Sequence, residues 1–196
     1  MIPLREFIYG RNPVYETLRA KRRDAFRLQV AEGVQDKGRL SEILELAAGR
    51  KIPVERVPRP RLDKLSDSHQ GVALEVGGYP YVDLEDILDK AASSGELLFT
   101  LVLDTLQNPQ NLGTLLRTAE AVGVHGVLLP AHRAAGVTPA VVSASAGATE
   151  HMLVAQTNLA QAIDRIKEAD AWVIGLDESP ESRGPSEVRM EVRWQW

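Results

Sequence analysis

The sequence contains no cysteine among its 196 residues, and it has no long uninterrupted apolar run. The lack of cysteine excludes disulfides and thiolate metal sites. The four histidines lack metal-ligand spacing, so we expect no metal. No apolar run is long enough to span a membrane, and the first twelve residues lack the apolar core of a secretory signal. These absences predict a cytoplasmic protein with no membrane partner.

Two common nucleotide-binding motifs are also missing. The sequence has no GxGxxG segment and no Walker-type loop, which excludes the usual dinucleotide and NTP cradles. The net charge of −4 argues mildly against a nucleic-acid partner. Its distribution argues the other way, because residues 1–80 carry a net charge of +4 and residues 81–196 carry −8. A basic first part suggests contact with phosphates, although ordinary scatter of surface charge explains the counts equally well.

Hydrophobic periodicity divides the chain into two parts joined by a linker at 81–96, in which residues 82–92 are expected to form a helix. Residues 1–80 are predicted to form a compact α/β unit, and residues 97–196 an alternating parallel α/β domain. The first unit is expected to have helices at 13–20 and 40–48, a helical turn at 62–65, and strands at 26–32, 52–57 and 72–76. The second part is expected to have strands at 97–104, 125–130, 152–155 and 172–177, and helices at 112–122, 138–148 and 159–170.

The segment from Leu101 to Ala121 is the most informative part of the chain. An apolar strand leads through an Asn/Pro turn to a helix that Asn111 is expected to cap. Gly113 and Arg117 lie four residues apart, so they are expected to share one face, where the glycine would let a ligand approach closely. Arg117 offers a guanidinium suited to phosphate. On local physics alone, a plain cap and a solvated arginine remain the favoured interpretation.

Two further groups of residues are candidates for contacts with a ligand. One group consists of small residues followed by an acid: Ser143, Ser145, Gly147, Glu150 and His151. This pattern would suit a pocket lined by backbone. It would also suit a tightly packed helix with an exposed glutamate. The other group is basic and lies near the N-terminus. Each member alone is best explained as a solvated charge, but together they predict an RNA-binding patch: Arg11, Asn12, Arg19, Lys21, Arg22 and Arg23.

Three strings carry a resemblance to a known family: NPQNLGTLLRTAEAVGVHGVLLP from Asn108, GRNPVYETLR from Gly10 and HQGVALEV from His69. Over about residues 6–178 the chain resembles the SpoU/TrmH family, the knotted SPOUT-class RNA ribose 2′-O-methyltransferases. The resemblance implies a small N-terminal α/β domain similar to ribosomal protein L30, followed by a Rossmann-like SPOUT domain with a parallel sheet. It also implies S-adenosylmethionine as co-substrate, ribosomal RNA (23S rRNA) as partner, and a homodimer.

The resemblance also implies roles for individual residues. Asn111, Arg117 and Glu150 fall on catalytic positions, with Arg117 binding an RNA phosphate and helping to activate the ribose hydroxyl. Gly113 and Ser145 fall on the RNA side of the site. Residues that would bind the methyl donor cannot be named, because the family's Gly/Glu-rich second motif and its Ser/Leu/Asn third motif find no counterpart in this sequence.

The tail at 179–196 departs from the family pattern. Its apolar residues alternate with polar ones, as in a one-sided strand. We therefore expect a C-terminally incomplete SPOUT domain, truncated by a reading-frame shift near Ser182 to Ser186, with catalytic competence in question. The first alternative is a non-catalytic RNA-binding protein derived from such an enzyme. The second is an unrelated nucleotide-binding α/β protein.

Overall fold

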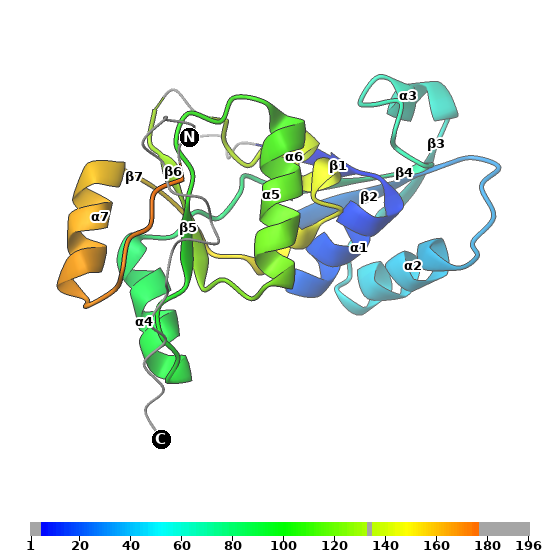
Figure 1. Cartoon of the computed structure of the whole chain (residues 1–196). Coiled ribbons are helices and arrows are strands. Elements are labelled where there is room, and N and C mark those ends of the chain that lie inside the picture. Colours follow the sequence, from blue (N-terminus) through cyan, green and yellow to red (C-terminus); the bar gives the residue numbers. More distant parts are fainter. Residues whose placement is uncertain (1–4, 133–134, 177–196) are drawn as a thin grey trace.

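The computed structural model describes residues 5–132 and 135–176, which form two α/β modules packed against each other (Figure 1). The N-terminal module comprises β1 (Arg5–Tyr9), α1 (Arg11–Ala20), β2 (Ala25–Ala31), α2 (Arg39–Gly49), β3 (Val54–Val57), α3 (Arg59–Asp63) and β4 (Val72–Gly77). The C-terminal module comprises α4 (Leu84–Ser94), β5 (Thr100–Val102), α5 (Pro109–Ala121), β6 (Gly126–Pro130), α6 (Pro139–Ala144), the 3-10 helix η1 (Ala148–His151), β7 (Val154–Thr157) and α7 (Leu159–Glu168).

The N-terminal module is a four-stranded sheet in the order β1-β4-β2-β3. β4 runs antiparallel to β1 and β2, while β2 and β3 are parallel. Successive side chains along each strand point to opposite faces of the sheet, and both faces carry apolar residues. Leu28 and Leu74 face the main core together with residues of α1 and α2. Ala31 and Ala73 face the opposite way, where Leu62 of α3 covers them.

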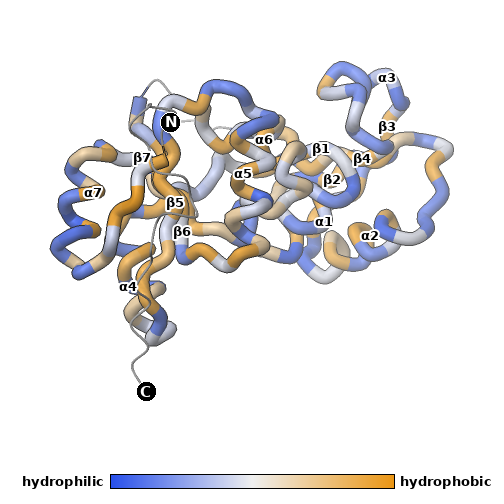
Figure 2. The backbone as a smooth tube through the Cα atoms, viewed as in Figure 1, coloured by the Kyte–Doolittle hydropathy of each residue, from blue (hydrophilic) through white to orange (hydrophobic). Residues whose placement is uncertain are grey.

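The C-terminal module is built on a parallel sheet in the order β5-β6-β7. Helices cover both faces, as a parallel sheet requires. Val127 and Leu129 of β6 belong to the main core with α5 and α6, while Leu128 between them belongs to a second core with α4 and α7. Figure 2 shows hydrophobic residues running along the strands of this sheet and polar residues on the outer turns of α7. No described helix is both long and apolar enough to cross a membrane.

Most predicted elements are confirmed, although the helix predicted at 138–148 ends at Ala144 as α6, and η1 follows it separately. Three further differences concern β1, α3 and the last predicted strand. β1 was not predicted, although it pairs along its length with β4. The helical turn predicted at 62–65 lies earlier, as α3. The strand predicted at 172–177 is wrong for its described residues, because 172–176 join neither sheet and leave Trp172 and Leu176 more than 80% exposed. An apolar run predicts burial, but a strand also needs a neighbouring backbone to pair with. Asp177 and the tail at 179–196 lie outside the described residues.

The start of α5 differs from the prediction in its cap. Asn108, not Asn111, caps the helix, and its Oδ1 accepts from the backbone N–H of Gln110 at 2.8 Å. Pro109 then takes the first helical position, which suits its fixed φ and its missing N–H. Asn111 therefore lies inside the first turn with an exposed side chain. The apolar side chains of Leu115 on α5 and of Val122 directly after it are exposed as well.

Gly113 lies at the contact between α5 and α6 and is buried there. A Cβ at this position would meet the Cβ of Ala144 at 2.4 Å and the backbone nitrogen of Ser145 at 3.0 Å. The expectation that this glycine leaves an open surface for a ligand is therefore wrong. Its missing side chain instead lets two helices approach closely.

Replacing Gly113 with alanine should destabilise the protein, because the added methyl group forces α5 and α6 apart. Overpacking of this kind costs about 1–3 kcal/mol. Gly49, at the end of α2, is the matched control, since a Cβ there meets nothing within 4 Å. Gly49→Ala should be neutral or slightly stabilising. Urea unfolding of the two variants measures the difference, and equal free energies of unfolding would contradict the packing role.

Candidate functional site

A cavity of about 360 Å³ opens where the two modules meet. α1 contributes Glu16 and Arg19, and α5 contributes Arg117 and Glu120. The segment around η1 completes the wall with Ser145, Ala146, Ala148 and His151. The cavity is therefore composite, and most of the side chains that line it are charged or polar.

Arg117 is one of two arginines in this wall. Its side chain is exposed, and it forms no salt bridge with any residue of the described ranges. Arg19 reaches the same cavity from α1, where its Nη1 lies 3.3 Å from Oε2 of Glu16 and its guanidinium lies over the ring of Tyr15. The site thus brings together Arg19 and Arg117, which are far apart in the sequence.

His151 also lines the cavity, opposite α1. Its Nε2 lies 2.8 Å from Oε2 of Glu16, so the carboxylate of one module contacts the imidazole of the other. In the sequence, His151 belongs to the group from Ser143 to His151 that is a candidate to line a pocket, and it does line the cavity. The contact with Glu16 spans 135 positions, and no sequence signal could have indicated it.

Glu150 does not face this cavity. It is buried, and its two carboxylate oxygens accept from Nε and Nη2 of Arg23 at 3.0 and 2.8 Å. Burial raises the pKa of the Glu150 carboxyl above its ordinary value, while the Arg23 guanidinium partly offsets this effect. The expected catalytic position is therefore occupied by an acid that is fully engaged in a buried ion pair.

Arg22 and Arg23 are also placed differently from the expectation. Arg23 is buried, and its Nη1 donates to Glu6 at 3.0 Å in addition to the pair with Glu150. Arg22 donates to the carbonyl oxygens of Pro80 and Met152. Both guanidinium groups bond across the junction of the two modules, where Arg23 is buried and Arg22 is half-buried, and their expected contact with RNA stays a prediction.

Tyr79 strengthens the same junction and was missed by the sequence analysis. It is buried, and its hydroxyl donates to the carbonyl oxygen of Thr149 at 2.8 Å. The guanidinium of Arg23 lies 4.9 Å from the centre of its ring. Burial raises the pKa of Tyr79 to about 12. A tyrosine two residues after a strand gives no sign in the sequence that it reaches another module.

The remaining predicted residues are spread over the surface and the cavity wall. Ser145 lines the cavity but is buried, and its hydroxyl donates to the carbonyl oxygen of Val142 at 3.0 Å. Arg11 and Asn12 lie at the start of α1, about 12 Å along the helix from Arg19 by the usual rise per residue. Arg11 contacts the carbonyl oxygen of Gln70, and Asn12 is exposed. Asn111 lies on α5 outside the cavity wall.

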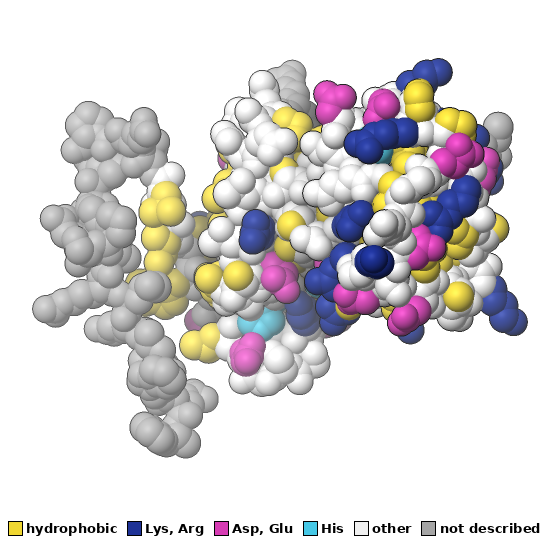
Figure 3. Space-filling model, turned by 90° about the vertical axis from the view of Figure 1, so that its right-hand side faces the viewer, with side chains coloured by type: hydrophobic (Ala, Val, Ile, Leu, Met, Phe, Trp, Pro, Cys, Tyr) yellow, Lys and Arg dark blue, Asp and Glu magenta, His cyan; other side chains and the backbone are white. Residues whose placement is uncertain are grey.

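The two arginines of the cavity can bind an anionic ligand, although Glu16 and Glu120 share the cavity wall. Two guanidinium groups from different modules face one cavity, and arginine binds phosphate oxygens through paired donors. Figure 3 shows many Lys and Arg side chains on the face presented by the N-terminal module, with Asp and Glu side chains among them. Among the described residues, no group of three or more His, Cys, Asp or Glu side chains is placed to hold a metal ion.

Comparison with known proteins connects this arrangement with a family. Residues 7–82 match the family described as RNA 2′-O ribose methyltransferase substrate binding, and residues 98–194 match the SpoU rRNA methylase family. The chain is 42% identical over 176 residues to YacO of Bacillus subtilis, assigned to the TrmH family of tRNA/rRNA methyltransferases, and covers 70% of it. The chain belongs to the SpoU/TrmH family.

Further relatives and solved structures agree with this membership. A TrmH family tRNA/rRNA methyltransferase of Staphylococcus saprophyticus is 43% identical over 72% of this chain. The SpoU methyltransferase AviRb from Streptomyces viridochromogenes, solved with AdoMet, has a TM-score of 0.63 at 18% identity over 84% of this chain. An RNA 2′-O ribose methyltransferase has a TM-score of 0.62 at 23% identity over 85% of this chain. These two structures share the SPOUT fold.

The chain spans only part of its relatives. It covers 57% of the Staphylococcus protein and 60% of each of the two solved chains. The match to the SpoU rRNA methylase family continues to residue 194, through the tail whose pattern departs from the expected one. That tail lies outside the described residues.

The Arg23–Glu150 pair should couple strongly when it is tested by a double-mutant cycle. Glu150→Leu or Arg23→Met alone leaves one buried charge without its partner in this pair, which costs about 3–5 kcal/mol. Arg23→Met with Glu150→Leu should cost much less than the sum of the two single changes, because both charges are removed. Urea unfolding measures each free energy. Additive single changes would show that the two side chains do not depend on each other.

Tyr79 should make the protein sensitive to alkaline pH. Its pKa in the folded protein is about 12, against an ordinary value of 10.0, so the unfolded chain loses the phenolic proton first. The contribution of Tyr79 to the free energy of unfolding is therefore fully present below pH 10. It falls by about 2–3 kcal/mol as the pH rises from 10 to 12. Unfolding free energies measured across this range should fall less in Tyr79→Phe than in the unmodified protein. Parallel curves would contradict the assignment.

Proposed function

We propose that the chain acts as an RNA ribose 2′-O-methyltransferase that takes its methyl group from S-adenosylmethionine and modifies ribosomal RNA, specifically 23S rRNA, in the cytoplasm. Membership of the SpoU/TrmH family supports methylation of RNA. The family description of residues 7–82 supports the ribose 2′-hydroxyl as target. The AdoMet bound in AviRb supports the donor.

One observation carries the proposal: the cavity at the junction of the modules. The part that matches substrate-binding domains supplies Arg19, and the part that matches methylases supplies Arg117. A phosphodiester chain that lies in the cavity would contact both guanidinium groups. This would place its ribose close to α5, the helix that carries Arg117.

Arg117 has two roles in this proposal. Its guanidinium binds an RNA phosphate and, through that contact, positions the neighbouring ribose so that its 2′-hydroxyl can be activated. A guanidinium has five N–H donors and no acceptor atom, so the proposed role of Arg117 is to bind and position. Asn111, exposed six residues earlier on α5, is proposed to hydrogen-bond the target nucleotide. Arg11 and Asn12 would extend the RNA path along α1.

Glu150 is proposed as a positioning residue rather than a catalytic one. Its carboxylate fixes Arg23, which follows α1 and so determines where Arg19 lies relative to Arg117. This role replaces the direct one implied by resemblance. The larger organisation is proposed as an RNA-binding domain at 1–80, a linker at 81–96 and a methyltransferase domain at 97–196, working as a homodimer.

The donor itself is not assigned to side chains. S-adenosylmethionine supplies the methyl group when it is bound. The wall of the described cavity holds two arginines and two glutamates, so its charge does not select a positively charged sulfonium. Within residues 5–132 and 135–176 no side chain is therefore assigned to the donor.

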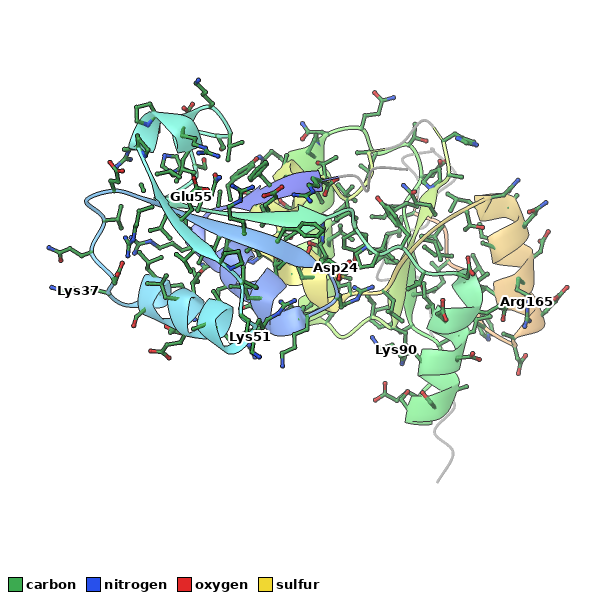
Figure 4. The ribbon with its side chains drawn as sticks, turned by 180° about the vertical axis from the view of Figure 1, so that it is seen from behind. Asp24, Lys37, Lys51, Glu55, Lys90 and Arg165 are labelled. Atoms are coloured by element: carbon green, nitrogen blue, oxygen red, sulfur yellow. The ribbon has the colours of Figure 1, made fainter. Side chains whose placement is uncertain are left out.

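The test is a methyl-transfer assay with the whole chain, labelled S-adenosylmethionine and 23S rRNA. Arg117→Ala should lower the rate about 10²–10³-fold, the usual effect of removing one positioned donor. Arg165→Ala is the matched control, because Arg165 is a half-exposed arginine on α7 that pairs with Glu85. Figure 4 shows Arg165 far from the N-terminal module, in which Lys37, Lys51 and Glu55 are labelled.

Alkaline hydrolysis of the product identifies the modified atom, since a 2′-O-methylated ribose protects the adjacent phosphodiester bond. A label on a base would contradict the ribose target. RNA binding without any methyl transfer, from a folded sample, would contradict the enzyme proposal and establish a non-catalytic RNA-binding protein instead. Full activity in Arg117→Ala would contradict the role of this arginine.

A further inference from the structure

Glu16 is an acidic side chain in a cavity that otherwise suits an anion. Its carboxylate oxygen Oε2 lies 2.8 Å from Nε2 of His151 and 3.3 Å from Nη1 of Arg19. All three side chains line the cavity together with Arg117. Glu16 therefore contacts Arg19 and His151, two side chains that would otherwise be available to a phosphate.

The position of Glu16 is determined by the backbone around it. Gly147, which precedes η1 with φ of +91°, lies so close to α1 that a Cβ there would meet the Cβ of Glu16 at 2.7 Å. It would also lie 3.2 Å from Cα of Pro13. The absent side chain of Gly147 lets α1 approach η1 closely, so Glu16 is held beside His151.

The charges in the cavity are balanced rather than basic. Arg19 and Arg117 carry positive charges, and Glu16 and Glu120 carry negative ones. Glu120 forms no salt bridge with any residue in the described ranges, whereas Glu16 contacts both Arg19 and His151. Glu16 is thus the acidic side chain whose removal would change the anion-binding capacity of the cavity most.

We propose that Glu16 acts as a built-in competitor for RNA phosphate, and that substrate binding displaces its carboxylate from Arg19 and His151. This inference rests on the proposed RNA-binding function and concerns how the same site is regulated. A phosphate oxygen takes the place of Glu16 Oε2, and the released carboxylate turns toward solvent. Displacing the carboxylate breaks its contacts with Arg19 and His151. Only an RNA that contacts several groups of the cavity at once offsets this loss, so Glu16 weakens the binding of non-specific RNA.

The experiment compares Glu16→Gln with Glu42→Gln as a matched control. Both glutamates pair with an arginine three residues away on a helix of the N-terminal module, and both variants change the net charge equally. The probe is a fluorescein-labelled 20-nucleotide poly(U), and fluorescence anisotropy measures its Kd. Since exposed ion pairs contribute about 0.2–1 kcal/mol, Glu16→Gln should bind up to about fivefold more tightly.

The salt dependence separates displacement from a general effect of charge. One additional phosphate contact should steepen the plot of log K against log salt by about 0.7 for a single strand. Glu42→Gln should leave this slope unchanged. Glu16→Asp keeps the charge on a shorter side chain, so its affinity for poly(U) should lie between those of Glu16→Gln and the unmodified protein. This variant replaces Glu16→Gln in the test if Glu16→Gln does not fold.

Weaker or unchanged binding by folded Glu16→Gln, or an equal gain in Glu42→Gln, would overturn the inference. Absence of poly(U) binding by every variant would overturn both the inference and the RNA-binding function. Binding only by Glu16→Gln would support the competitor role. The methyl-transfer assay tests the proposed function separately, so the two failures are distinguishable.

Discussion

The buried ion pair of Arg23 and Glu150 is the interaction on which the rest of the site depends. Removing two charges from water is costly, and such a pair is tolerated only where every polar group is satisfied. Arg23 meets this condition through Glu150, Glu6 and the carbonyl oxygen of Gly77. No buried side-chain polar atom among the described residues lacks a hydrogen-bond partner. Because this pair joins the modules, it also fixes the distance between α1 and α5, the helices that carry Arg19 and Arg117.

This dependence changes the interpretation of the basic residues near the N-terminus. Residues 1–80 carry a net positive charge, but part of it lies inside the protein. Arg22 and Arg23 bond to groups at the junction of the two modules. Arg5 and Arg27 pair with Glu75 across the sheet. What remains for an RNA is a small number of placed cations rather than a uniformly basic surface. Specific placement of this kind favours the recognition of a particular path of phosphates over general attraction.

The local parts of this fold were predictable and its long-range contacts were not. Periodicity located α1, α2, α5 and the parallel strands, because these depend on neighbours in the sequence. The motif around Arg117 was recognised from its residues. The pairing of Glu150 with Arg23 could not be predicted from the sequence, since the contact spans 127 positions. Gly113 shows the same limit: a glycine on a helix indicates a close approach, but only the structure identifies Ala144, rather than a ligand, as the approaching group.

A site made at a junction has a physical consequence that a site within one module does not have. Any motion that opens the contact between α1 and η1 separates Arg19 from Arg117 and also breaks the contact of Glu16 with His151. Anion-binding capacity is therefore coupled to docking of the modules: the cavity loses its paired cations when the junction opens. Glu16 has two opposite effects on anion binding. It bridges the modules and so keeps the cavity closed, and it competes with the anion for the same cations. In the proposed function, the carboxylate of Glu16 therefore both holds the junction together and restrains RNA binding.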